Sequence, residues 1–230
     1  MTTRKISHPT LEERREAGKL ARKRVPRSNL EGWKPADNRP DPISLLEDQN
    51  ETREPDLVPV RHGRMMVSPF TFYRGGAKIM AADLASIPRA GLDVQLCGDA
   101  HLSNFGAFAS PERVLLFDLN DFDETLPGPF EYDMARLAAS FVVASRDNGF
   151  SEARAAEAAA ASVASYRTSM ATFAGMRTLD VWYAKLDVDE IMATAAAARN
   201  KRDRKLAAQA EKNIANVGRR PIRWVTRLKA

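Results

Sequence analysis

The sequence predicts an α+β fold, and three observations lead to that prediction. Residues 91–99 alternate as a strand that runs into a turn, and residues 114–117 form a second apolar strand, each ending in acidic residues. After residue 130, apolar side chains recur at helical spacing. Strands followed by helices are typical of an α+β domain. At 230 residues and 44% hydrophobic, the chain can bury a core.

The elements before the first strand are predicted from caps and spacing. Residues 1–24 read as a charged helix, because Thr10 and Glu13 have capping-box spacing. A linker rich in Pro, Asn and Asp follows, and then a short helix over residues 44–53. Residues 56–65 are expected to be extended, and residues 77–85 carry a one-sided apolar stripe that predicts a helix.

The elements after residue 110 are predicted in the same way. Val114 to Phe117 reads as a buried strand that ends in acids. The helix after residue 131 ends at Gly149, a plausible C-cap, and Ser151 is a good N-cap for the Ala-rich helix that follows. A third helical stretch is expected from near Asp187 into the basic tail.

Charge divides the chain into three expected parts, at residues 1–42, 43–198 and 199–230. Residues 1–40 contain eleven Lys and Arg against five Asp and Glu, and residues 199–230 contain eleven against two. The two ends therefore carry net charges of +6 and +9. Because the whole chain carries a net charge of +5, the middle carries about −10. The basic ends could contact nucleic acid, but they lack interleaved aromatic residues, which favours solvated helix faces.

The composition also indicates the cellular compartment in which the protein is expected. No run of eighteen apolar residues and no apolar leader segment is present, so neither a membrane span nor a secretory signal is expected. One cysteine, Cys97, allows no intrachain disulfide. We therefore expect a cytoplasmic protein; its oligomeric state is not predicted.

The polar residues that follow the two strands are of the kinds that catalyse phosphoryl transfer in enzymes. Asp99 and Asn104 lie five residues apart in "CGDAHLSN", and Asp121 follows the second strand. One carboxylate can accept a hydroxyl proton, while an amide oxygen and a second carboxylate can hold Mg²⁺. Asp118 or Asp123 could replace Asp121 as the ligand. His101 has no second His or Cys near it in sequence, so a hydrogen-bonding role is favoured over metal ligation.

"GDAHLSN" followed by "DFDETLPGPFEYD" resembles the catalytic core of aminoglycoside phosphotransferase-like kinases. The resemblance implies Asp99 and His101 as catalytic-loop residues, and Asn104 with Asp121 as ligands of Mg²⁺ and ATP. It also implies a Gly-Pro turn that leads to Asp133, at a helix start, as the residue that braces the catalytic loop. The acceptor would be a hydroxyl of an unknown small molecule or protein.

The chain departs from this pattern in two places. Cys97 stands where such kinases usually carry His. No glycine-rich loop with its strand Lys precedes the catalytic loop. The nearest segment is "RGGAK", Arg74 to Lys78, which reads better as a turn and helix start than as a phosphate cradle.

The longer string over residues 70–170 resembles a bacterial family named domain of unknown function 2252. Its members typically extend well beyond this chain's length, so the 230 residues resemble an N-terminal portion or a shortened product. The two resemblances together imply an incomplete or permuted protein-kinase-like fold, mainly its helical catalytic lobe.

Three functions stay open at this stage. The first is a Mg²⁺- and ATP-dependent phosphotransferase, or an inactive remnant of one. The second is a metal-dependent phosphoester hydrolase that uses Asp99, His101, Asp118 and Asp121. The third is a non-enzymatic protein that binds an acidic partner or nucleic acid through its basic ends.

Overall fold

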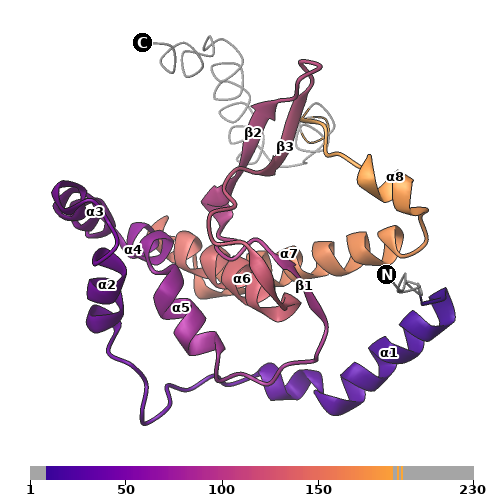
Figure 1. Cartoon of the computed structure of the whole chain (residues 1–230), viewed down its shortest axis with the longest axis horizontal. Coiled ribbons are helices and arrows are strands. Elements are labelled where there is room, and N and C mark those ends of the chain that lie inside the picture. The colour runs from indigo at the N-terminus through magenta and orange to yellow at the C-terminus, as the bar shows by residue number, and fades with distance from the viewer. Residues whose placement is uncertain (1–8, 189–190, 192, 194–230) are drawn as a thin grey trace, which may run out of the picture. The chain divides into compact units, whose positions relative to one another are not determined.

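The computed structural model describes residues 9–188, 191 and 193 (Figure 1). The chain divides into two compact units. Met1–Leu102 and Phe122–Gly175 form the first, which we call the helical unit, and Ser103–Asp121 and Met176–Ala230 form the second, the hairpin unit. Helices and small antiparallel sheets confirm the α+β class. The expected boundaries at residues 42 and 198 stay predictions.

The helical unit contains most of the described helices. They are α1 (Leu11–Arg24), α2 (Pro42–Asn50), α3 (Val58–Met65), α4 (Pro69–Gly75), α5 (Ala77–Leu84), α6 (Phe130–Asp147) and α7 (Glu152–Phe173), with 3-10 turns η1 (Arg27–Leu30) and η2 (Pro55–Leu57). A further turn, η3 (Leu102–Asn104), covers the point at which the chain passes from one unit to the other.

The helix ends predicted from caps are confirmed. At α1, the Thr10 side chain accepts from the Glu13 N–H and the Glu13 carboxylate accepts from the Thr10 N–H. At α7, the Ser151 side chain accepts from the Arg154 N–H. Gly149, just after α6, has a φ of +71°, the left-handed conformation that a terminal glycine adopts at low cost.

The prediction of an extended segment at residues 56–65 was wrong, because the chain there is helical. Pro55 occupies the first turn of η2, and α3 likewise carries a proline in its first turn. Ser68 then caps α4, which also begins with a proline. Proline at the first helical position has a favourable φ and loses no intrahelical hydrogen bond.

The helical unit also holds a two-stranded antiparallel sheet of β1 (Asp93–Leu96) and β4 (Leu126–Pro129). β1 confirms the strand predicted over residues 91–99. β4 covers the segment that the kinase pattern assigns to a turn. Its prolines, opposite Asp93 and Gln95, are tolerated because each strand of a two-stranded sheet is an edge strand.

The described part of the hairpin unit is built around β2 (Phe105–Ala109) and β3 (Leu115–Leu119), which pair antiparallel. β3 confirms the predicted second strand, displaced towards the C-terminus, but Phe117 is exposed and only Leu119 is buried. A short helix, α8 (Thr178–Trp182), follows later in the chain, and Asp187 forms a bridge to β3. The helix expected from near Asp187 lies largely outside the described residues.

Two packed clusters hold the helical unit together. Leu46, Met65 and Ile79, from α2, α3 and α5, form a buried apolar core. α6 packs along α7 (Figure 1), where the rings of Phe130 and Tyr166 stack with centroids 6.3 Å apart. The buried residues of α6 include Arg136 and Ser140, which belong to the candidate site.

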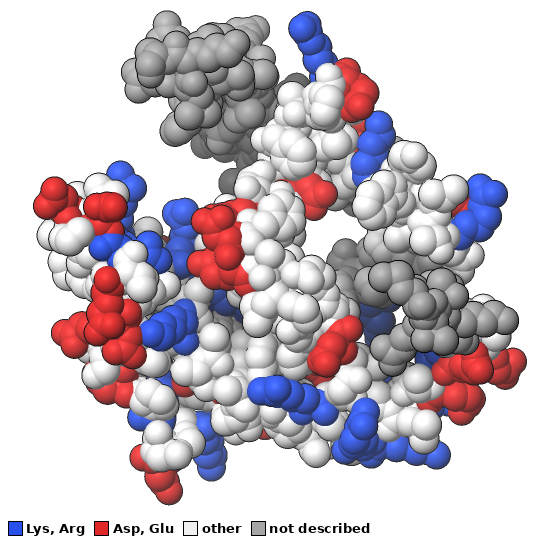
Figure 2. Space-filling model, in the orientation of Figure 1, with Lys and Arg blue, Asp and Glu red and all other residues white. Residues whose placement is uncertain are grey.

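Charged side chains of both signs mix on the surface of α2 and α3 (left of Figure 2). The basic segment 199–230 lies outside the described residues. Among the helices described, none combines the length and the apolar character that crossing a membrane requires.

Candidate functional site

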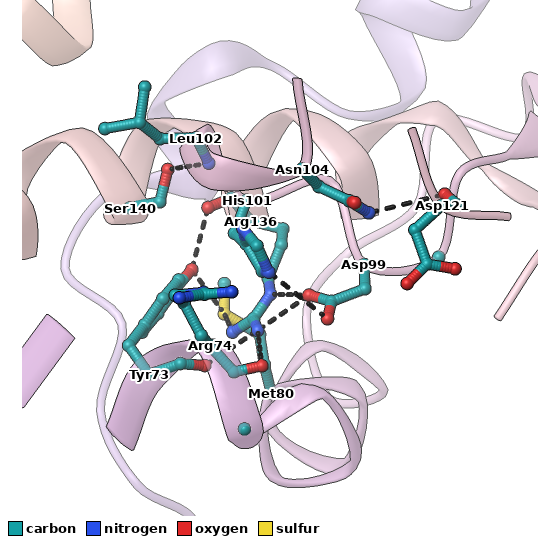
Figure 3. Close-up of polar contacts among 12 residues, drawn as sticks. Tyr73, Arg74, Met80, Asp99, His101, Leu102, Asn104, Asp121, Arg136 and Ser140 are labelled. Carbon is teal, nitrogen blue, oxygen red and sulfur yellow. Dashed lines mark hydrogen bonds and ion pairs between the residues drawn. The ribbon is translucent and has the colours of Figure 1, made fainter. Parts of the chain in front are cut away.

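The loop over residues 97–102 is attached to one face of α6 (Figure 3). Three polar residues of α6, Asp133, Arg136 and Ser140, contact this loop. Their spacing of three and then four residues places them on one side of an α-helix. The helix thus presents an acceptor, a cation and a hydroxyl to successive parts of the loop.

Asp133 holds the beginning of the loop through both carboxylate oxygens. The Cys97 N–H donates to Oδ2 at 2.7 Å, and the Gly98 N–H donates to Oδ1 at 3.1 Å. Hydrogen bonds from backbone N–H groups to a carboxylate are among the stronger ones in proteins. Asp133 therefore anchors the backbone at the start of this loop.

The backbone conformation of Gly98 determines the direction in which this loop continues. Its φ is +85°, and a Cβ placed there would collide with the backbone carbonyl of Glu124. Both the conformation and the space therefore require glycine at this position. The tight turn at Gly98 aims the following residue, Asp99, towards α6.

Arg136 pairs with Asp99. The Arg136 Nε and Nη2 atoms lie 2.8 and 2.7 Å from Asp99 Oδ1, and the arginine side chain is only 2% exposed. Nη2 also donates to the Tyr73 carbonyl at 2.7 Å, and the guanidinium lies 4.0 Å from the centroid of the Tyr73 ring. Burial raises the pKa of Tyr73 to about 12, although the Arg136 charge opposes that rise. The Tyr73 hydroxyl is therefore protonated at neutral pH and donates to the Arg136 carbonyl at 2.7 Å.

His101 is buried beside this ion pair. Its Nε2 lies 3.6 Å from Asp99 Oδ2, and its backbone N–H donates to the Asp99 carbonyl at 2.8 Å. Burial lowers the pKa of His101; the Arg136 and Arg74 charges lower it further, and Asp99 partly opposes them. His101 is therefore neutral at pH 7. Its Nδ1 has no hydrogen-bond partner among the residues that the structure describes.

The end of the loop is held by Ser140, which is fully buried. The Leu102 N–H donates to Ser140 Oγ at 2.9 Å, and the Ser140 hydroxyl donates in turn to the Leu137 carbonyl at 2.6 Å. The loop is thus fixed at its first residues by Asp133 and at its last by Ser140.

In the hairpin unit, strand register brings Asn104 and Asp121 together. Phe105 pairs with Leu119, so the residues just outside the two strands meet at the same end of the hairpin. The Asn120 N–H donates to the Asn104 carbonyl at 2.8 Å, and the buried Asn104 Nδ2 donates to the Asp121 carbonyl at 3.3 Å. The Asp121 residue is exposed.

Asp118 has a different setting in the same hairpin. It pairs with Gly106 within the ladder, and its Oδ1 accepts from the Leu119 N–H at 2.8 Å. This contact orients the carboxylate along its own strand. The contact between Asn104 and Asp121 uses the Asp121 main-chain carbonyl, and its carboxylate is a separate group.

The side-chain types at the hairpin end are compatible with Mg²⁺. Asn104 and Asp121 offer hard oxygen donors, and Mg²⁺ bound with a nucleotide uses only one or two protein carboxylates. Within the described part of the chain, no three His, Cys, Asp or Glu side chains gather closely enough to hold a metal ion.

The segment "RGGAK" is a helix junction, as predicted. α4 ends at Gly75 and α5 begins at Ala77. A Cβ at Gly75 would collide with the Met65 side chain, so close packing of two helices explains this glycine. Arg136 forms an ion pair with Asp99.

Sequence reasoning missed Ser140 and Tyr73. A signal for Ser140 existed, because Asp133, Arg136 and Ser140 recur at helical spacing on a face that also carries apolar residues. Tyr73 had no comparable signal, since its partner Arg136 is 63 residues away in sequence.

Comparisons with known proteins give one match. Neither the curated proteins nor the solved structures contain a match to this chain. The profile of a family described as "Uncharacterized protein conserved in bacteria (DUF2252)" matches residues 53–220. This span includes the loop at residues 97–102, the α6 face that holds it and the hairpin end. The chain therefore belongs to the bacterial family DUF2252.

Proposed function

We propose that this protein is a Mg²⁺- and ATP-dependent phosphotransferase of the kinase-like type that acts on a hydroxyl group. The observation that supports this most is the pair of hydrogen bonds from Cys97 and Gly98 to Asp133. This is the contact that the resemblance to aminoglycoside phosphotransferase-like kinases implies between the catalytic loop and the following helix.

The proposed roles follow the chemistry of each side chain. Asp99 orients the acceptor hydroxyl and accepts its proton as the acceptor oxygen bonds to the γ-phosphorus. The bond from that phosphorus to the β–γ bridging oxygen breaks, and ADP leaves. Asn104 and Asp121 would hold the Mg²⁺, and the Mg²⁺ would bind the nucleotide phosphates. Bound Mg²⁺ would neutralise charge on the transferring phosphoryl group.

His101 has a supporting role in this proposal. Because it is buried and neutral at pH 7, it adds no charge next to Asp99. Its backbone N–H holds the Asp99 carbonyl. We assign it to the shape of the catalytic loop and not to proton transfer.

The test is isothermal titration of the full 230-residue chain with ATP, in the presence and absence of Mg²⁺. We expect binding that needs the metal and that Asp121→Asn weakens by about tenfold or more, because a charged ligand is lost. The matched control is Glu112→Gln, which changes an exposed acid in the connection between β2 and β3 and should bind as the wild type does.

Two further outcomes would change the proposal. If Asp118→Asn, and not Asp121→Asn, abolishes binding, the metal ligand is Asp118. If the folded wild-type chain binds no ATP with Mg²⁺, the proposal is wrong for this chain.

A further inference from the structure

Arg136 is the most buried charged side chain of the candidate site. It is 2% exposed, and the side chain of its partner Asp99 is 13% exposed. A buried guanidinium is costly unless its charge is paired and its N–H groups have acceptors. Asp99 pairs the charge, and the Tyr73 carbonyl takes a further hydrogen bond.

The contacts use the fork shape of the guanidinium. Nε and Nη2 both face the same oxygen, Asp99 Oδ1, while the guanidinium lies 4.0 Å from the centroid of the Tyr73 ring. A lysine has one nitrogen and no planar group, so it cannot make these contacts together. Tyr73 and Arg136 also hold each other through the Tyr73 hydroxyl and the Arg136 carbonyl (Figure 3).

The attachment of the loop backbone does not depend on Arg136. Cys97 and Gly98 donate to Asp133, and Leu102 donates to Ser140. Arg136 holds the side chain of Asp99. Asp133 and Ser140 therefore hold the backbone of the loop, whereas Arg136 orients the Asp99 carboxylate.

We propose that Arg136 is a positioning residue for phosphoryl transfer, which fixes the Asp99 carboxylate in the orientation that engages the acceptor hydroxyl, and that the Tyr73 ring holds Arg136 in place. This inference rests on the proposed phosphotransferase function. It predicts that the shape of the side chain at position 136 matters as well as its charge.

The experiment compares Arg136→Lys with the wild-type full chain in two measurements. The first is hydrolysis of ATP with Mg²⁺, in which water is the acceptor and released inorganic phosphate is counted. The second is the Kd for ATP with Mg²⁺ by isothermal titration. We expect kcat to fall by about 100-fold, since misplacing a catalytic group by about 1 Å has effects of this size. Kd should stay within about twofold, because ATP binding does not use Asp99.

Arg146→Lys serves as the control, and Tyr73→Leu is a second variant of the site. Arg146→Lys changes another α6 arginine, which pairs with Glu152 at the surface, and should leave kcat unchanged. Tyr73→Leu leaves the Asp99–Arg136 pair chemically intact but removes the ring beneath the guanidinium. It should lower kcat less than Arg136→Lys does, and it keeps the test usable if Arg136→Lys does not fold.

The outcomes separate the two proposals. If the wild type neither binds nor hydrolyses ATP with Mg²⁺, the proposed function and this inference both fall. If the wild type is active and both site variants match it, Arg136 does not position Asp99. If kcat and ATP binding are lost together with thermal stability in both site variants, Arg136 is structural only, which also overturns the inference.

Discussion

At the scale of single residues, Gly98 shows how one backbone conformation determines a site. The residue combines a φ of +85° with close contact to the Glu124 carbonyl. Gly149 has a similar φ of +71°, but nothing lies within 4 Å of where its Cβ would be. A side chain at Gly149 would meet only an unfavourable φ, whereas a side chain at Gly98 would also collide with Glu124.

Gly98→Ala is expected to lower the free energy of unfolding by roughly 2 kcal/mol or more, because the side chain adds a collision to an unfavourable φ. Gly149→Ala should cost about 1 kcal/mol, the conformational part alone. Urea denaturation of both variants measures the difference. Equal losses would mean that the Glu124 carbonyl moves aside without cost.

At the scale of elements, α6 organises the candidate site. Its first turn supplies Asp133, its second supplies Arg136, and Ser140 follows one turn later. A rigid helix keeps these three groups at fixed separations. The loop at residues 97–102 therefore takes its shape from α6 and needs no regular structure of its own.

Asp133→Asn tests this dependence. An amide side chain can accept only one of the two backbone N–H bonds, and its NH₂ group would face the other donor. We expect a loss of about 1–3 kcal/mol in the free energy of unfolding and faster hydrogen exchange at Cys97 and Gly98. Asp147→Asn, at the end of α6, is the control, because Asp147 accepts only an exposed Ser68 hydroxyl. Unchanged exchange at both amides in Asp133→Asn would argue against the bracing contact.

At the scale of the whole molecule, the buried histidine links stability to pH. The pKa of His101 is lowered in the folded protein, first by burial and then by Arg136 and Arg74. The unfolded chain, with an ordinary histidine pKa of about 6.5, therefore binds more protons in the window below that pKa. The contribution of this group to stability is present above the unfolded pKa and is lost as the pH falls from the unfolded pKa towards the lower folded pKa.

Wild-type protein is therefore expected to lose free energy of unfolding between pH 7.5 and pH 5.5, and His101→Gln should lose less over the same interval. Denaturation at the two pH values measures both slopes, and other titrating groups cancel in the difference. His62→Gln, in α3, removes a histidine that does not contact Asp99 or Arg136. A steeper slope in His101→Gln than in the wild type would contradict the assignment.

Local signals in the sequence predicted a good part of the fold. The Thr10–Glu13 capping box, the Ser151 cap and the terminal Gly149 each depend on residues within four positions of one another. Such contacts can be read from the sequence because the helix itself sets their geometry. Residues 56–65 were misread because their prolines were not recognised as helix starts.

For the candidate site, the sequence predicted the types of residue that take part but not which of them contact one another. The sequence by itself determined the α+β class, the family, the capped helices and the segment 97–104, which carries Asp99, His101 and Asn104. Only the tertiary structure decided that Arg136 is the partner of Asp99 and that Asp133 binds the loop backbone. These partners are 35 to 37 residues apart. Contacts across such separations depend on the path of the folded backbone, which no local spacing specifies.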